Sequence, residues 1–118
     1  MKRKVLFYKT KDGKCPIRDF LDALTGKVAQ KIIWVLNLIE DLEAIPSIYF
    51  KKLPGSKDIW ECRIQLGSNM YRIFCFFEKG AVIVLTHGII KKGQKIPRRE
   101  IDKAEKYRRD YLRRRKNE

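Results

Sequence analysis

The residues of this chain best suited to chemistry are basic side chains that follow one another closely in its C-terminal half. They are Arg72, His87, Lys91, Lys92 and Lys95. Guanidinium and ammonium groups bind phosphate oxygens, and an imidazole moves protons near neutral pH. This stretch therefore favours chemistry on a phosphate chain, or binding to one.

Arg72 lies among apolar residues in a segment with the pattern of a β-strand. Because a buried arginine is costly without a partner, we expect its side chain to project from the sheet toward an anion. The structural alternative is a salt bridge to Glu61 or Asp58 on the neighbouring strand, and composition favours neither. Arg63 converges on the same surface if the two strands form a hairpin, and its alternative is an ordinary solvated strand face.

The other candidates have structural alternatives as well. His87 ends a strand-like segment, where it suits a general acid or base but also simple packing or capping. The three lysines suit phosphate binding or a solvated loop. Tyr71, next to Arg72, suits stacking on a base or a place in the core. Arg98 adds a cation just beyond the lysines and is a further RNA-binding candidate.

Other kinds of site have little support in the sequence. There is no phosphate-binding glycine loop, no pair of catalytic carboxylates and no cluster of metal ligands. Cys15, Cys62 and Cys75 are widely spaced and form no zinc motif. We therefore expect neither a metal nor a cofactor. An enzyme of this kind would act on RNA, whose 2′-hydroxyl attacks the neighbouring phosphodiester once the strand is oriented and the added charge is stabilised.

The chain of 118 residues carries a formal net charge of +14, and much of it is concentrated at one end. Residues 91–118 contain thirteen Lys or Arg and five Asp or Glu. This asymmetry points to a polyanionic partner; an acidic protein fits equally well and an anionic membrane surface less well. No signal-peptide pattern and no membrane-length apolar run is present, so we expect a cytoplasmic protein with no membrane partner.

The hydrophobic pattern predicts a single α+β domain over residues 1–118. Segments with strand character are residues 5–8, 48–53, 58–66, 71–77 and 81–88. Segments with helical character are residues 16–24, residues 28–42 and a stretch that begins after Pro97. We expect the order β-α-α-β-β-β-α, with about four strands in a small antiparallel sheet and the two N-terminal helices on one side. In residues 58–66 the alternation predicts one buried and one solvated face.

Seven short motifs follow one another in a characteristic order along nearly the whole chain. They are residues 16–21 (PIRDFL), 53–55 (LPG), 59–63 (IWECR), 71–74 (YRIF), 87–92 (HGIIKK), 94–97 (QKIP) and 100–104 (EIDKA). Together they resemble the phage-derived, HigB-like branch of the RelE/ParE toxin superfamily. The resemblance implies a RelE-like fold and a toxin of a type II toxin–antitoxin pair. Its antitoxin would be a separate protein, typically with a helix-turn-helix DNA-binding domain.

The resemblance also implies an activity and roles for the candidate residues. Toxins of the RelE and HigB kind cleave mRNA in the ribosomal A site, without a metal, and leave a 2′,3′-cyclic phosphate. Arg72 would then contact the scissile phosphate, Arg63 would be a basic strand residue of the site, and His87 and the lysines would supply further catalytic or phosphate-binding groups. Two alternatives stay open: a ParE-like toxin that poisons gyrase, and a non-catalytic basic module that binds RNA or DNA.

Overall fold

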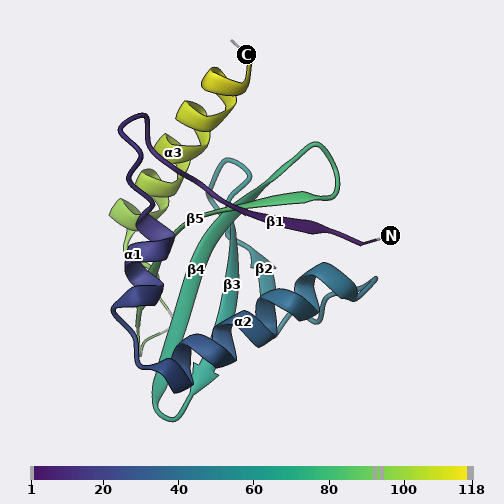
Figure 1. The fold of residues 1–118 in the computed structure, drawn as a ribbon, viewed down its shortest axis with the longest axis vertical. Helices are drawn as coiled ribbons and strands as arrows, with labels where there is room; N and C mark the ends of the chain where they lie inside the picture. The colour runs from purple at the N-terminus through teal and green to yellow at the C-terminus, as the bar shows by residue number, and fades with distance from the viewer. Residues whose placement is uncertain (1, 92, 94, 117–118) are drawn as a thin grey trace.

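The computed structural model describes residues 2–91, 93 and 95–116, which form a layered α+β fold (Figure 1). A five-stranded sheet has the strand order β1-β5-β4-β3-β2. The strands are β1 (Lys4–Phe7), β2 (Phe50–Lys52), β3 (Trp60–Leu66), β4 (Asn69–Glu78) and β5 (Val82–Ile90). β1 pairs with β5 in parallel, and the other neighbouring strands are antiparallel.

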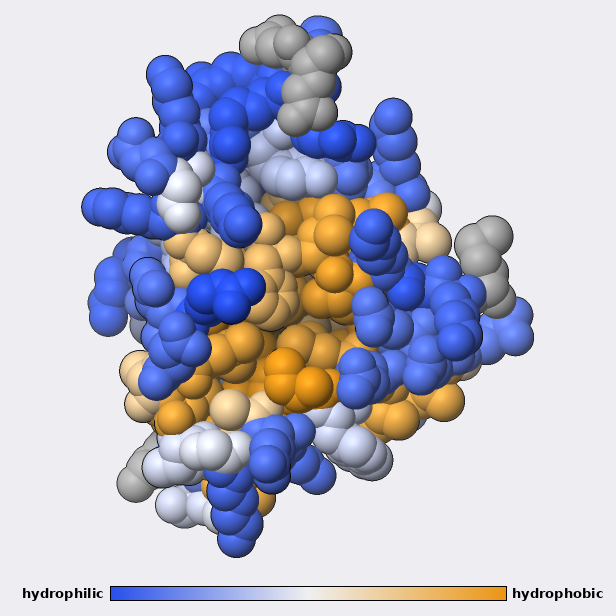
Figure 2. All heavy atoms as spheres, viewed as in Figure 1, coloured by the Kyte–Doolittle hydropathy of each residue, from blue (hydrophilic) through white to orange (hydrophobic). Residues whose placement is uncertain are grey.

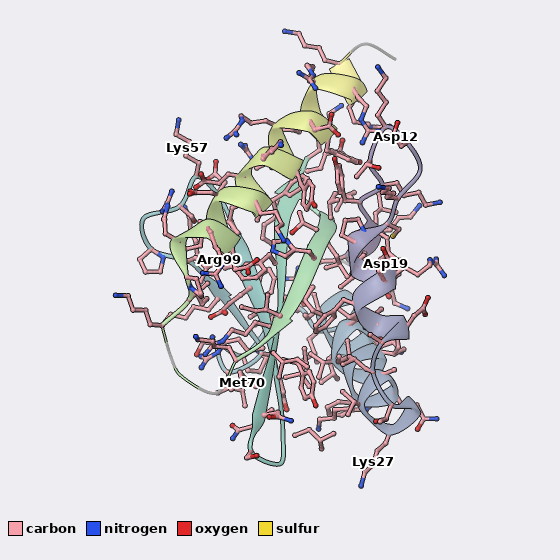
Figure 3. All side chains as sticks on the ribbon, turned by 90° about the vertical axis from the view of Figure 1, so that its left-hand side faces the viewer. Asp12, Asp19, Lys27, Lys57, Met70 and Arg99 are labelled. Atoms are coloured by element: carbon pink, nitrogen blue, oxygen red, sulfur yellow. The ribbon has the colours of Figure 1, made fainter. Side chains whose placement is uncertain are left out.

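Helices cover both faces of the sheet, as the view in Figure 3 shows. α1 (Pro16–Asp22) and α2 (Gly26–Asp41) pack on one face, and α3 (Arg98–Lys116) packs on the other. Side chains alternate along β4, so that Ile73 belongs to the α1–α2 core and Phe74 to the α3 core. The sheet therefore has an apolar core on each side.

The helices lie where the sequence predicts them. Pro16 occupies the first turn of α1, where no helical hydrogen bond needs its missing N–H. α2 buries a single stripe of apolar residues, which are Ile32, Val35, Leu36 and Ile39. None of the three helices in the described part of the chain has the length and apolar character that crossing a membrane requires.

The sheet differs from the prediction in its first strand. All five segments with strand character form strands, so the sheet has five strands rather than about four. It is mixed rather than wholly antiparallel, because β1 pairs in parallel with β5. Local patterning contains no information about which distant strand an N-terminal segment will pair with. The predicted α+β class is confirmed.

The second face of β3 differs from the prediction in part: Gln65 is exposed as predicted, but the other two polar residues of that face are buried or half-buried. Glu61 is only 3% exposed, and Arg63 on the same face is partly buried. Ile96, just before α3, and Ile101, near its start, line a pocket together with Glu61. Glu61 is therefore enclosed beneath α3, although the alternation assigns it to solvent.

The loop between β2 and β3 is fastened to α3 by polar contacts. Arg98 donates a hydrogen bond to the carbonyl of Gly55, and the backbone N–H of Lys57 donates to Glu105 at 2.9 Å. The two helix residues that make these bonds, Arg98 and Glu105, lie in the first half of α3. Residues 53–58 therefore form a fixed wall beside the first turns of α3.

Candidate functional site

Three charged residues from β3 and β4, Glu61, Arg63 and Arg72, form a cluster on the α3 face of the sheet, which we call the Glu61 cluster. Arg63 and Arg72 lie directly opposite each other in the β3–β4 register. Glu61 Oε2 is 2.9 Å from Arg72 Nη1, and Glu61 Oε1 is 3.7 Å from Arg63 Nε. Two like charges opposite each other on neighbouring strands repel, so the carboxylate is what stabilises the cluster.

The Glu61–Arg72 pair is enclosed by the protein. The two side chains are 4% and 3% exposed. Burying two charges is costly, and their attraction offsets that cost only when the geometry is good and other hydrogen bonds are made. Arg72 Nη2 makes one such bond, to the carbonyl oxygen of Gly93 at 3.1 Å. Of the two settings that the sequence allows for Arg72, the structure has the salt bridge to Glu61.

Both arginines retain an unused donor. Among the described residues, the Nε atoms of Arg63 and Arg72 are buried and lack a hydrogen-bond partner. Leaving a buried N–H unsatisfied costs about 1–3 kcal/mol, and such groups in native proteins call for a specific explanation. One explanation is that the cluster can bind a further acceptor, such as a phosphate oxygen.

A pocket of about 280 Å³ opens beside the Glu61 cluster. Glu61 lines it together with two exposed lysines, Lys51 and Lys95, and with the apolar side chains of Ile96 and Ile101. Lys51 lies directly opposite Glu61 in the β2–β3 register. Within the described residues, neither lysine has an ion-pair partner. The pocket thus combines a buried carboxylate with two unpaired ammonium groups.

His87 faces the same side of the sheet but is enclosed. Its ring stacks on Phe74, with 4.7 Å between centroids, while Nδ1 lies 3.1 Å from Thr86 Oγ1 and Nε2 lies 3.2 Å from Glu100 Oε1. Burial, aided by the charge of Lys103, lowers the pKa of His87 to about 4 against the opposing effect of Glu100. The ring is therefore neutral at pH 7. Its acid–base role stays a prediction, and the geometry favours the packed alternative.

The remaining predicted residues have different settings. Tyr71 is 5% exposed and belongs to the α1–α2 core, on the opposite face from Arg72, which favours a core role over base stacking. Lys91 is half-buried, and Lys92 lies outside the described residues. Of the three predicted lysines, Lys95 is the one that lines the pocket in the described part of the chain.

Arg98 is engaged by groups of the protein itself. Its Nε is 2.9 Å from Asp102 Oδ1, its Nη1 donates to the Gly55 carbonyl at 2.7 Å, and its Nη2 is 3.4 Å from Glu105 Oε2. These contacts hold the loop of residues 53–58 against α3. The RNA-binding role of Arg98 stays a prediction, and its present contacts make it a positioning residue for the wall of the pocket.

Sequence reasoning identifies Glu61 only as a partner for Arg72, and it misses Lys51. A usable signal exists for Glu61, because residues two apart on a strand share a face, which puts this carboxylate beside Arg63. No comparable signal exists for Lys51. Its place in the site depends on the register between β2 and β3, and β2 is only three residues long.

The cysteines belong to the α1–α2 core, on the opposite face of the sheet from this site. In the described ranges, no group of three or more His, Cys, Asp or Glu side chains is placed to hold a metal ion. Cys62 Sγ and Cys75 Sγ are 3.9 Å apart in the α1–α2 core. Burial, followed by the hydrogen bond with Cys62, raises the pKa of Cys75 well above its usual value, which makes its thiol a poor nucleophile.

Comparison with known families accounts for most of the chain. Residues 19–109 match the family described as "Phage derived protein Gp49-like (DUF891)", and they include the whole Glu61 cluster and its pocket. Members of this family are commonly toxin-like modules of the RelE type. A search of curated proteins finds no match. The chain therefore belongs to the Gp49-like, phage-derived family, which is part of the broader RelE/HigB-like toxin group.

Proposed function

We propose that this protein is the toxin of a type II toxin–antitoxin pair, in the HigB-like branch, and that it acts in the cytoplasm as a ribosome-dependent, metal-independent endoribonuclease on mRNA. The observation that carries the proposal is the Glu61 cluster beside its pocket: a buried carboxylate paired with Arg72, next to two unpaired lysines. A phosphodiester and its neighbouring 2′-hydroxyl offer negative charge and a removable proton. The cations of the site are complementary to the charge of the phosphodiester, and the carboxylate is complementary to the 2′-hydroxyl as a proton acceptor.

The proposed reaction is attack by the 2′-oxygen on the adjacent phosphorus, with cleavage of the bond between phosphorus and the 5′-oxygen. Glu61 takes the 2′-hydroxyl proton through Oε1, the oxygen that does not bind Arg72. Lys51 and Lys95 stabilise the negative charge that develops on the phosphate, and one of them supplies a proton to the departing 5′-oxygen. The products are a 2′,3′-cyclic phosphate and a 5′-hydroxyl.

In this mechanism Arg72 keeps the role of phosphate ligand and also orients Glu61. Its Nη1 remains on Glu61, while its Nη2, which donates to the Gly93 carbonyl, transfers to a phosphate oxygen. A charged phosphate is a stronger acceptor than a neutral carbonyl, so the exchange is favourable. Arg63 adds a second guanidinium on the other side of the carboxylate.

The proposal includes two macromolecular partners: the ribosome with its mRNA, and a cognate antitoxin of the helix-turn-helix kind that is typical of this branch. The net charge of +14 attracts RNA and also an acidic antitoxin. Competition between these partners for the same cations would provide neutralisation. No membrane partner is part of the proposal.

A non-catalytic basic module is the second candidate, and the enclosure of Arg72 and His87 is the observation in its favour. Induced expression in a bacterial host separates the candidates when translation, DNA supercoiling and mRNA 5′ ends are followed together. We expect translation to stop, discrete mRNA cuts to appear and supercoiling to stay unchanged. Altered supercoiling with uncut mRNA would favour a ParE-like toxin. Unimpaired growth, with salt-sensitive RNA binding and no cuts, would favour the non-catalytic module.

A further inference from the structure

The outward side of α3 carries almost only cations. The exposed residues of the helix are Arg98, Arg99, Asp102, Lys103, Lys106, Arg109, Arg113, Arg115 and Lys116. The other three acids of the helix, Glu100, Glu105 and Asp110, are partly buried and contact groups of the protein. Figure 2 shows hydrophilic side chains gathered over the part of the molecule where α3 lies. The helix therefore presents an excess of positive charge to solvent.

Some of these cations border a hollow of about 400 Å³, which we call the Lys106 hollow. Its other wall is the loop after β1, which lies beside α3 in Figure 1. Lys11 from this loop, and Lys106 and Arg109 from the helix, line the hollow. Among the described residues, none of these three has an ion-pair partner. Three unpaired cations in one concavity are suited to bind anions.

Two carboxylates also line the hollow, and one of them is already neutralised. Asp110 accepts a hydrogen bond from the Tyr8 hydroxyl and lies 3.2 Å from Arg113 Nη2 and 2.9 Å from Arg114 Nη2. The Tyr8 hydrogen bond and the two arginines lower the pKa of Asp110, and burial together with Asp110 raises the pKa of Tyr8 to about 12. Asp12 is exposed on the loop. The charge of the hollow remains positive.

We propose that the Lys106 hollow binds backbone phosphates of RNA, as a second contact site separate from the pocket at Glu61. That pocket is bordered by β2, β3 and the start of α3, whereas the hollow is bordered by the loop after β1 and the middle of α3. β1 and β2 are the opposite edges of the sheet. An RNA strand bound at both sites therefore crosses over α3. The choice of RNA rests on the proposed function, while the anion-binding character of the hollow does not.

Within the described residues, no large aliphatic or tryptophan side chain is exposed around the hollow, although the buried Tyr8 and the half-buried Tyr107 line it. In the described chain, the exposed large hydrophobic residues are Ile33, Trp34, Leu42, Ile48 and Ile90. All of them lie outside α3 and outside the loop after β1. Stable protein interfaces bury aromatic and aliphatic anchors at their centre, whereas phosphate contacts need only ammonium, guanidinium and other N–H donors.

The salt dependence of RNA binding tests this proposal. The probe is a fluorescent single-stranded RNA oligonucleotide with 2′-O-methyl groups, which cannot undergo 2′-hydroxyl attack, and its Kd is measured by anisotropy over a range of salt concentrations. The variant combines Lys11→Ala, Lys106→Ala and Arg109→Ala. We expect weaker binding and a plot of log K against log salt that is shallower by about 2, because each phosphate contact on a single strand contributes roughly 0.7.

The matched control removes the same charge elsewhere. It combines Lys4→Ala, Lys27→Ala and Lys79→Ala, which replace exposed side chains that do not line the hollow. The control should keep the slope of the wild type, and circular dichroism should show both variants folded. Equal slopes for the wild type and the hollow variant, equal losses in both variants, or no binding by the wild type would each overturn the proposal.

A separate cleavage assay on programmed ribosomes distinguishes failure of this inference from failure of the proposed function. If the wild type leaves mRNA intact but the hollow variant has a shallower salt slope, the Lys106 hollow binds phosphate and the proposed enzyme activity is wrong. If the wild type cleaves mRNA but the slope is unchanged in the hollow variant, the activity stands and this inference is wrong.

Discussion

The carboxylate of Glu61 and the guanidinium of Arg72 form a buried ion pair, with 2.9 Å between Glu61 Oε2 and Arg72 Nη1. Because Arg72 holds one oxygen of the carboxylate, the other is oriented toward Arg63, at 3.7 Å. The pair therefore has two roles in the proposed site. It stabilises a charged cluster within the sheet, and it orients a proton acceptor beside the two lysines of the pocket.

The stability role predicts strong coupling between the two residues. Removing one partner of a buried ion pair leaves the other charge without a counterion, which costs about 3–5 kcal/mol. Glu61→Gln and Arg72→Gln should each lower the free energy of unfolding by an amount of that order, and the double variant should lose less than the sum. Urea unfolding of the wild type and the three variants at pH 7 measures the coupling. Losses that simply add would show that the pair contributes nothing as a pair.

Two adjacent lysines of β2 provide a matched test of the pocket. Lys51 lines the pocket opposite Glu61, whereas Lys52 pairs with Asp58 at 3.6 Å. Removing a group that stabilises transition-state charge typically lowers kcat by about 10²–10³-fold. Lys51→Ala should therefore reduce mRNA cleavage on ribosomes by an amount of that order, and Lys52→Ala should change it little. Similar rates for the two variants would place the chemistry elsewhere.

His87 makes the stability of the fold depend on pH. Its pKa falls from an ordinary 6.5 to about 4 on folding, in surroundings that include Glu100 and Lys103. Between these pH values the unfolded chain binds a proton that the folded chain does not. Protonation of the unfolded chain therefore lowers the free energy of unfolding as the pH falls. The contribution of His87 is unchanged above about pH 6.5 and declines by about 3 kcal/mol as the pH falls to 4. Urea unfolding from pH 4 to 7 should show this decline in the wild type and not in His87→Asn.

The same His87→Asn variant tests the acid–base role. Because the ring is enclosed and both of its nitrogens lie near protein groups, we expect the folded variant to keep mRNA cleavage. The comparison is made at pH 7 and at a temperature where unfolding curves show both proteins to be folded. Loss of cleavage under those conditions would restore His87 to the catalytic set.

Arg98 and its neighbour Arg99 test how the wall of the pocket is held. Arg98 contacts Gly55, Asp102 and Glu105, while Arg99 lies 3.8 Å from Glu100 and is otherwise exposed. In Arg98→Ala we expect faster hydrogen–deuterium exchange in residues 53–58, because the loop loses a contact to α3. Arg99→Ala should exchange at the wild-type rate. Unchanged exchange in the Arg98 variant would mean that the loop is held by its other contacts.

Those parts of the fold that depend on local periodicity could be predicted from the sequence. The apolar stripe of α2 repeats at helical spacing, and Pro16 marks the start of α1, so both helices were predictable. The pairing of β1 with β5 was not, because two apolar strands carry no mark that identifies their partner. The cover over β3 depends in the same way on where α3 packs.

The candidate site follows the same division. Arg72 is recognisable because an arginine within an apolar strand is unusual. Whether it faces solvent or Glu61 depends on the register of β3 and β4 and on the enclosure beneath α3, which local patterns do not contain. Lys51 enters the site only through its register with Glu61. A site residue could be predicted where its type is unusual for its local sequence, as for Arg72. A site residue that is positioned by pairing between distant strands, as for Lys51, could not.

Mapping mRNA ends on ribosomes tests the proposed chemistry most directly. Purified wild-type protein and Glu61→Gln are each added to ribosomes programmed with a defined mRNA, and the new ends are located by primer extension and identified chemically. Circular dichroism confirms that the variant is folded. We predict discrete cuts by the wild type that carry 2′,3′-cyclic phosphate ends, and their loss in Glu61→Gln. An identical set of cuts in the folded variant, or ends that carry a 3′-hydroxyl, would contradict a mechanism in which Glu61 accepts the 2′-hydroxyl proton.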